Sequence, residues 1–129
     1  MNMGKLLAFA AVIEFGTGLV LMIEPAMVVR LLLGADISEG GMLVGRFFGI
    51  ALLGLGLACW PARLCATSDS PAFRAMLVYN LLIALYLAYL GTGGHLGVLL
   101  WPVVVFHAVV ALLLVWAWSI QRRVTGVSK

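Results

Sequence analysis

Residues 5–23 read KLLAFAAVIEFGTGLVLMI, an almost unbroken apolar run in which Glu14 is the only acid. A helix that crosses the hydrocarbon core of a bilayer needs ~20 consecutive, predominantly apolar residues. Three further runs of comparable length follow, at residues 40–60, 73–91 and 97–118. Together the four runs predict an all-α fold, a four-helix transmembrane bundle, in one integral-membrane domain over residues 1–129.

The composition supports the same class of protein. Hydrophobic residues make up 64% of the chain and charged residues 10%, and the mean hydropathy is +1.17. Soluble domains are only about 45–50% apolar and about 25% charged. The lipid bilayer is therefore the expected partner. The basic residues are few and scattered, which argues against a nucleic-acid partner.

The basic residues also predict the orientation of the chain. On one side of the membrane the loops contain a single basic residue, Arg30. On the other side, basic residues fall at the two termini and in or near the middle loop: Lys5, Arg63, Arg74, Arg122, Arg123 and Lys129. The positive-inside rule then predicts that both termini are cytoplasmic. The first run ends without a small-residue cleavage site, so we expect it to be a retained span and not a signal peptide.

A short segment after the first span is framed by Pro25 and Gly34. Proline at the first helical position and glycine just past the end are typical of a helix. This helix would be too short to cross, and its wide apolar face suits the outer headgroup region. The alternative is an extension of the first span, kinked at the proline.

Small residues recur at four-residue spacing in two of the runs. They are Gly41, Gly45 and Gly49 in the second, and Ala84 and Ala88 in the third. Such strips let two helices approach closely in a membrane. The partner helix belongs either to the same chain, which we favour, or to a second protomer.

Each span has one strongly polar side chain at depth: Glu14, Arg46, Asn80 and His107. Counting residues at 1.5 Å per residue places Glu14 ~13 Å from either face and Arg46 ~9 Å below the outer face. Ionisable groups at such depths are costly and usually pair or serve a function. We therefore expect an ion pair between Glu14 and Arg46, acting either as a structural clasp or as a ligand or proton site. Asn80 is expected to join helices, and His107 to be hydrogen-bonded in the interior.

No catalytic or metal-binding set can be recognised. The sequence offers no nucleophile with a base, no pair of carboxylates and no metal-ligand cluster, so it names no cofactor. Cys59 and Cys65 match no metal or redox motif, and on the predicted orientation they are free cytoplasmic thiols.

The chain resembles the small bacterial four-span proteins of the DoxX-like superfamily. The resemblance rests on short pieces spread over most of the chain: Glu14-Phe-Gly-Thr-Gly, Arg30-Leu-Leu-Leu-Gly, Arg46-Phe-Phe-Gly, Tyr79-Asn80, and Leu-Leu-Trp-Pro before His107. It implies a four-helix bundle in the bacterial inner membrane, with some relatives tied to redox or stress complexes. It carries over no catalytic residue.

Three functional hypotheses follow, in this order. The first is a non-enzymatic structural or accessory subunit that joins a larger membrane complex or self-associates. The second is a transporter or carrier of a small or lipophilic ligand with its site at Glu14, Arg46 and His107. The third is a redox subunit that handles quinone, so an enzymatic role ranks last.

Overall fold

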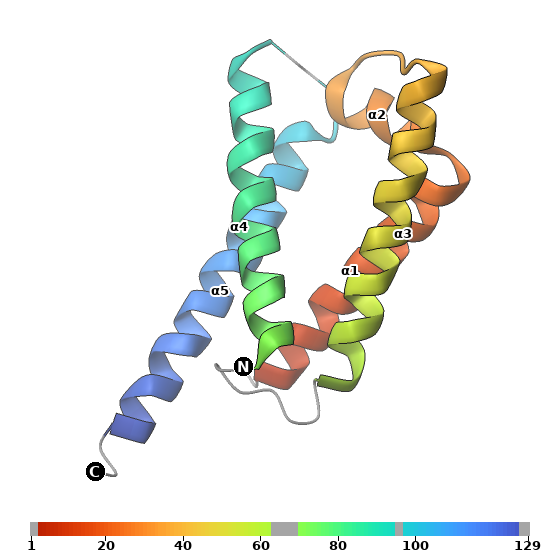
Figure 1. Ribbon diagram of the computed structural model, residues 1–129. Coiled ribbons are helices and arrows are strands. Elements are labelled where there is room, and N and C mark those ends of the chain that lie inside the picture. The colour runs from red at the N-terminus through yellow and green to blue at the C-terminus, as the bar shows by residue number, and fades with distance from the viewer. Residues whose placement is uncertain (1–2, 63–69, 95–96, 127–129) are drawn as a thin grey trace.

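The computed structural model describes residues 3–62, 70–94 and 97–126. These residues form five helices and no strand. Figure 1 shows how the helices are arranged. The helices are α1 (Met3–Ile23), α2 (Pro25–Leu33), α3 (Glu39–Ala62), α4 (Pro71–Thr92) and α5 (Leu100–Gly126). The predicted all-α bundle is confirmed, and α1, α3, α4 and α5 are each long and apolar enough to cross a membrane.

The helix α2 is a separate element and not an extension of α1. Glu24 leaves the helical conformation with φ −139° and ψ 70°, and Pro25 then occupies the first turn of α2. At the other end Gly34 adopts a left-handed conformation with φ 67°, and its N–H donates to the carbonyl of Arg30 at 2.9 Å. Glycine adopts this conformation without steric cost, which ends the helix here. The predicted proline and glycine boundaries are therefore confirmed, whereas the place of α2 in a membrane stays a prediction.

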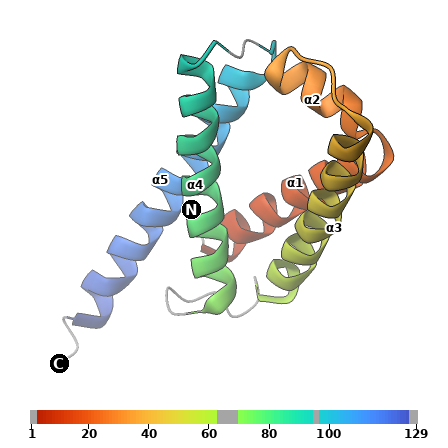
Figure 2. The same cartoon turned by 45° about the horizontal axis from the view of Figure 1, so that its top comes forward.

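The four long helices form two antiparallel pairs, α1 with α3 and α4 with α5 (Figure 1). The two pairs converge at the end where α1 begins, around a shared apolar core. That core contains Leu6, Leu7, Ala10, Ala11, Cys59, Phe73, Met76, Val110 and Leu114. At the opposite end the pairs spread apart, and α2 lies between them (Figure 2).

Glycines bring α1 and α3 into backbone contact. A Cβ added to Gly18 would lie 2.7 Å from the carbonyl oxygen of Gly49, and a Cβ on Gly49 would lie 2.7 Å from that of Gly18. Further along the pair, a Cβ on Gly56 would lie 2.8 Å from the carbonyl oxygen of Ala11. Two backbones can approach this closely only where side chains are absent. The partner of the glycine strip is thus a helix of the same chain.

The other residues expected in helix packing have different surroundings. Gly45 faces Pro25 at the start of α2, but the near neighbours of Gly41 are Ile37 and the adjacent Ser38, just before α3. The strip therefore ends at Gly45, because Gly41 lies beyond the segment where α1 accompanies α3. On α4, Ala84 is buried and Ala88 is half-buried.

Cys59 is fully buried near the start of α4, where its Sγ donates to the carbonyl oxygen of Ala72 at 3.6 Å. It is a free thiol. Cys65 lies outside the described residues.

The C-terminal end of α2 is fastened to the segment before α5. The N–H of Leu99 donates to the carbonyl oxygen of Leu31 at 2.8 Å. The N–H of Leu99 precedes α5, and the carbonyl of Leu31 lies in the last turn of α2. Groups at such helix ends have no partner within their own helix, so this bond satisfies both. Gly97 lies directly against the backbone of Leu31 and Leu32. These backbone atoms fill the space that a Cβ on residue 97 would need.

Gly97→Ala should therefore force α2 away from α5. We expect the free energy of unfolding to fall by about 1–3 kcal/mol, as for other overpacked sites. The measurement is thermal unfolding in detergent, followed by circular dichroism. Gly40→Ala is the control, because Gly40 lies at the same end of the bundle with nothing within 4 Å of an added Cβ. Equal stability of the two variants would contradict the fastening role of Gly97.

Candidate functional site

Glu14 lies on the buried face of α1, with an exposed fraction of only 1%. It shares this face with Leu7, Ala11, Gly18 and Leu21. These spacings of three and four residues place all five residues on one side of the helix. The Glu14 carboxyl thus points into the bundle and away from lipid.

One titratable neighbour of Glu14 is His107 of α5. The Oε1 of Glu14 is 3.8 Å from the Nδ1 of His107, which is too long for a hydrogen bond. Within the described part of the chain, Oε1 is the one buried side-chain nitrogen or oxygen atom without a hydrogen-bond partner. Such orphaned atoms are rare in native proteins and call for an explanation.

Asn80 of α4 holds His107 in place. Its Oδ1 is 2.9 Å from the Nδ1 of His107, and its Nδ2 donates to the carbonyl oxygen of Met76 at 2.8 Å. Asn80 is completely buried and His107 is 7% exposed. The contact links α4 to α5, the role expected for Asn80, and it provides the interior hydrogen bond expected for His107.

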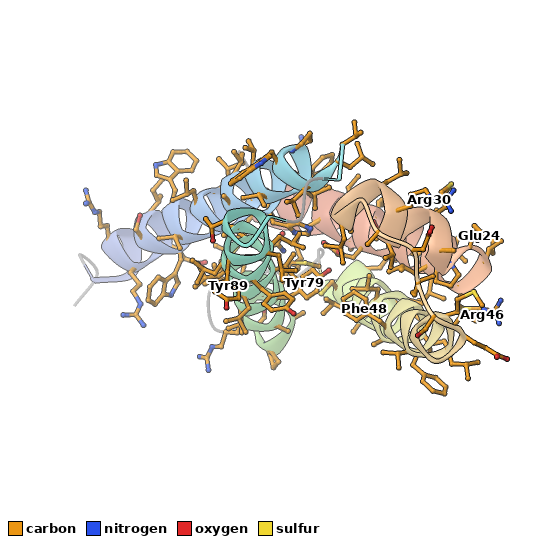
Figure 3. All side chains as sticks on the ribbon, turned by 90° about the horizontal axis from the view of Figure 1, so that it is seen from above. Glu24, Arg30, Arg46, Phe48, Tyr79 and Tyr89 are labelled. Atoms are coloured by element: carbon orange, nitrogen blue, oxygen red, sulfur yellow. The ribbon has the colours of Figure 1, made fainter. Side chains whose placement is uncertain are left out.

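Aromatic rings surround the His107 imidazole. Tyr79 and Phe106 meet it edge to face, with centroid distances of 5.8 Å and 5.4 Å. The hydroxyl of Tyr79 also interacts with the Glu14 carboxyl. In the view from above, Tyr79 lies between the two helix pairs (Figure 3). The four side chains Glu14, Tyr79, Asn80 and His107 form what we call the polar cluster.

A cavity of about 550 Å³ adjoins the polar cluster at the end of the bundle where α2 lies. Its wall is apolar except for Thr17, Tyr79 and His107. Each of the five helices contributes residues to the wall of the cavity. Those from α2 are Met27, Val28, Leu31 and Leu32. On the other side of the cluster lies the closed apolar core. The polar cluster therefore stands where the cavity ends and the packed core begins.

The expected pairing of Glu14 with Arg46 is corrected by the structure. Arg46 is exposed on α3 while Glu14 is buried, and no ion pair joins them among the residues described. Figure 3 shows Arg46 at the outer edge of the bundle, away from Tyr79. Counting residues gave the depth of Arg46 but not the direction in which it points. His107 takes the place beside Glu14 that Arg46 was expected to fill.

Sequence reasoning missed two contributors to this site. The first is α2, whose apolar face lines the cavity instead of lying only on the membrane surface. The second is Thr17, which follows Glu14 by three residues and so lies on the same side of α1. The separation of three residues was the available signal.

The residues that the structure describes contain no group of three or more His, Cys, Asp or Glu side chains able to hold a metal ion. His95, in the glycine-rich segment before α5, lies outside the described residues.

The four membrane-length helices define the chain as a multi-pass membrane protein. No protein-family model, curated protein or solved structure matches it. The resemblance to the DoxX-like proteins stays a prediction.

Proposed function

We propose that this protein binds and carries a lipophilic molecule in the cavity, with the polar group of that molecule against the polar cluster. The volume of about 550 Å³ falls in the range of about 300–1,000 Å³ typical of small-molecule sites. Such sites combine mostly apolar walls with a few placed polar groups, and this cavity has the same composition.

The observation that carries the proposal is that Tyr79 and His107, the two neighbours of the incompletely paired Glu14 carboxyl, line the mostly apolar cavity. An ionisable group inside a span is expensive to maintain. A purely structural role would be served by a partner that satisfies both carboxyl oxygens. The arrangement of an incompletely paired carboxyl, an imidazole and a phenol next to an apolar cavity instead suits the recognition of a polar group.

The accessory-subunit hypothesis explains less of the structure. It accounts for the glycine contacts between α1 and α3, which any stable bundle needs. It gives no reason for a large cavity that ends in buried polar side chains. We therefore place ligand binding ahead of a purely structural role.

We also propose a place for the protein: the inner membrane of a bacterium, with both termini in the cytoplasm. The support is the distribution of basic residues, which gather at the termini and around the connection from α3 to α4, where Arg63 follows α3 and Arg74 lies near the start of α4. In this orientation the cavity opens in the outer half of the membrane. Its ligand would then be taken from, or delivered to, the outer leaflet.

Filling the cavity tests the proposed binding. Val103 lines the cavity, whereas Val105 of the same helix is 59% exposed. Val103→Phe should lower the amount of bound decylbenzene about tenfold or more, because the added ring occupies the space of the ligand. Val105→Phe adds the same ring outside and should bind as the unsubstituted protein does.

Native mass spectrometry in mild detergent counts the bound decylbenzene, and thermal unfolding confirms that both variants fold. Failure of the unsubstituted protein to bind the hydrocarbon would overturn the proposed function. Equal binding by the two variants would overturn it as well.

A further inference from the structure

We propose that the ligand is a lipophilic alcohol or phenol whose hydroxyl donates a hydrogen bond to the Nε2 of His107. This inference rests on the proposed function and names the class of molecule that the same site takes. It follows from the hydrogen bonds that determine which nitrogen of His107 carries a proton.

The first step is the orientation of the Asn80 amide. Its Nδ2 donates to the carbonyl oxygen of Met76, an acceptor that offers no proton. The reverse orientation would set the amide oxygen against that carbonyl oxygen, with two acceptors facing each other. The amide oxygen Oδ1 must therefore face His107.

The second step is the tautomer of His107. Because Oδ1 of Asn80 can only accept, the Nδ1 of His107 at 2.9 Å must be the donor. The Glu14 carboxyl, 3.8 Å from the same nitrogen, favours a proton there too. A neutral imidazole with its proton on Nδ1 has a lone pair on Nε2.

The third step is where Nε2 lies. His107 lines the cavity. Its Nε2 has no hydrogen-bond partner in the described residues. If Nε2 were also buried, it would be a buried atom without a partner, and among these residues Glu14 Oε1 is the only such side-chain atom. Nε2 is therefore open to the cavity. It presents an acceptor to whatever occupies that space.

The fourth step is the chemistry of the occupant. The walls are apolar, so the body of the molecule must be hydrocarbon. An acceptor at the polar end calls for a donor on the ligand. A hydroxyl supplies one at little cost in desolvation, whereas a charged ammonium would be expensive at this depth. An ether or an ester lacks the donor and would leave Nε2 without a partner.

A competition between two probes tests the inference. The protein is mixed with equal amounts of para-octylphenol and para-octylanisole, its methyl ether, and the bound fraction of each is read by native mass spectrometry. We expect the unsubstituted protein to favour the phenol about five- to tenfold, the contribution of one buried hydrogen bond. In His107→Phe the preference should vanish while anisole binding remains. Comparison of the two proteins cancels the unequal partitioning of the probes into detergent.

A second variant covers the case in which His107→Phe does not fold. The double variant Asn80→Leu/His107→Phe removes both members of the pair, so neither is left without its hydrogen-bond partner. It should show the same loss of preference. Equal binding of phenol and anisole by the unsubstituted protein would overturn the inference and leave the proposed function standing. A preference that persists without His107 would also overturn it. Binding of neither probe would overturn both.

Discussion

Gly18→Ala and Gly49→Ala should each lower the free energy of unfolding by about 1–3 kcal/mol, the usual cost of an overpacked contact. Each added methyl group would lie 2.7 Å from the backbone oxygen of the opposite glycine. Backbone cannot turn aside as a side chain can, so α1 and α3 would have to separate. The measurement is unfolding in detergent, followed by circular dichroism.

Gly16→Ala and Gly54→Ala are the matched controls on the same two helices. A Cβ at either position would meet nothing within 4 Å. Alanine forms helix more readily than glycine, so these variants should keep their stability or gain about 0.5–1 kcal/mol. A similar loss in the controls would show that glycine is needed for a reason other than the contact between α1 and α3.

Glu14→Leu should change the free energy of unfolding by less than about 1 kcal/mol, because it removes a costly buried carboxyl but also the acceptor of the Tyr79 hydroxyl. The carboxyl is 1% exposed, and its Oε1 is without a hydrogen bond among the described residues. The same variant should bind para-octylphenol about fivefold more weakly, a loss of roughly 1 kcal/mol. The reason is that the carboxyl, 3.8 Å from the Nδ1–H that Asn80 also binds, polarises the imidazole and makes its Nε2 a stronger acceptor. Unchanged stability with loss of binding is the signature of a group kept for function.

Asn80→Leu is the comparison for that experiment. It removes a satisfied hydrogen-bond partner and leaves the Nδ1 proton of His107 with no acceptor at 2.9 Å. We expect a loss of about 1–2 kcal/mol in stability, the value found for hydrogen bonds between membrane helices in model peptides. If Glu14→Leu lost as much stability as Asn80→Leu, Glu14 would be a structural group and the clasp hypothesis would be favoured.

The elements of the fold were largely predictable from the sequence. The hydrophobic run predicted at residues 5–23 became α1 over Met3–Ile23, and the proline and glycine that frame α2 mark its observed ends. A bilayer requires long apolar helices, and the conformational limits of proline and glycine are local. Such properties can be evaluated without knowing which helices are neighbours.

The candidate site was only partly predictable. Glu14, Asn80 and His107 were expected in the interior and are buried there. Arg46 was expected beside Glu14 because the two lie at similar depths, yet it is exposed on α3. Depth follows from the rise of 1.5 Å per residue. The direction of a side chain depends on which face of its helix packs inward.

The sequence by itself determined the length, number and apolar character of the helices and the cost of the groups within them. The tertiary structure decided the rest: the pairing of α1 with α3 through Gly18 and Gly49, the place of α2 over the cavity, and His107 as the neighbour of Glu14. The physical reason is that lipid accepts any apolar face of a helix. Only close packing between helices selects the rotation of each one, and with it the side chains that meet.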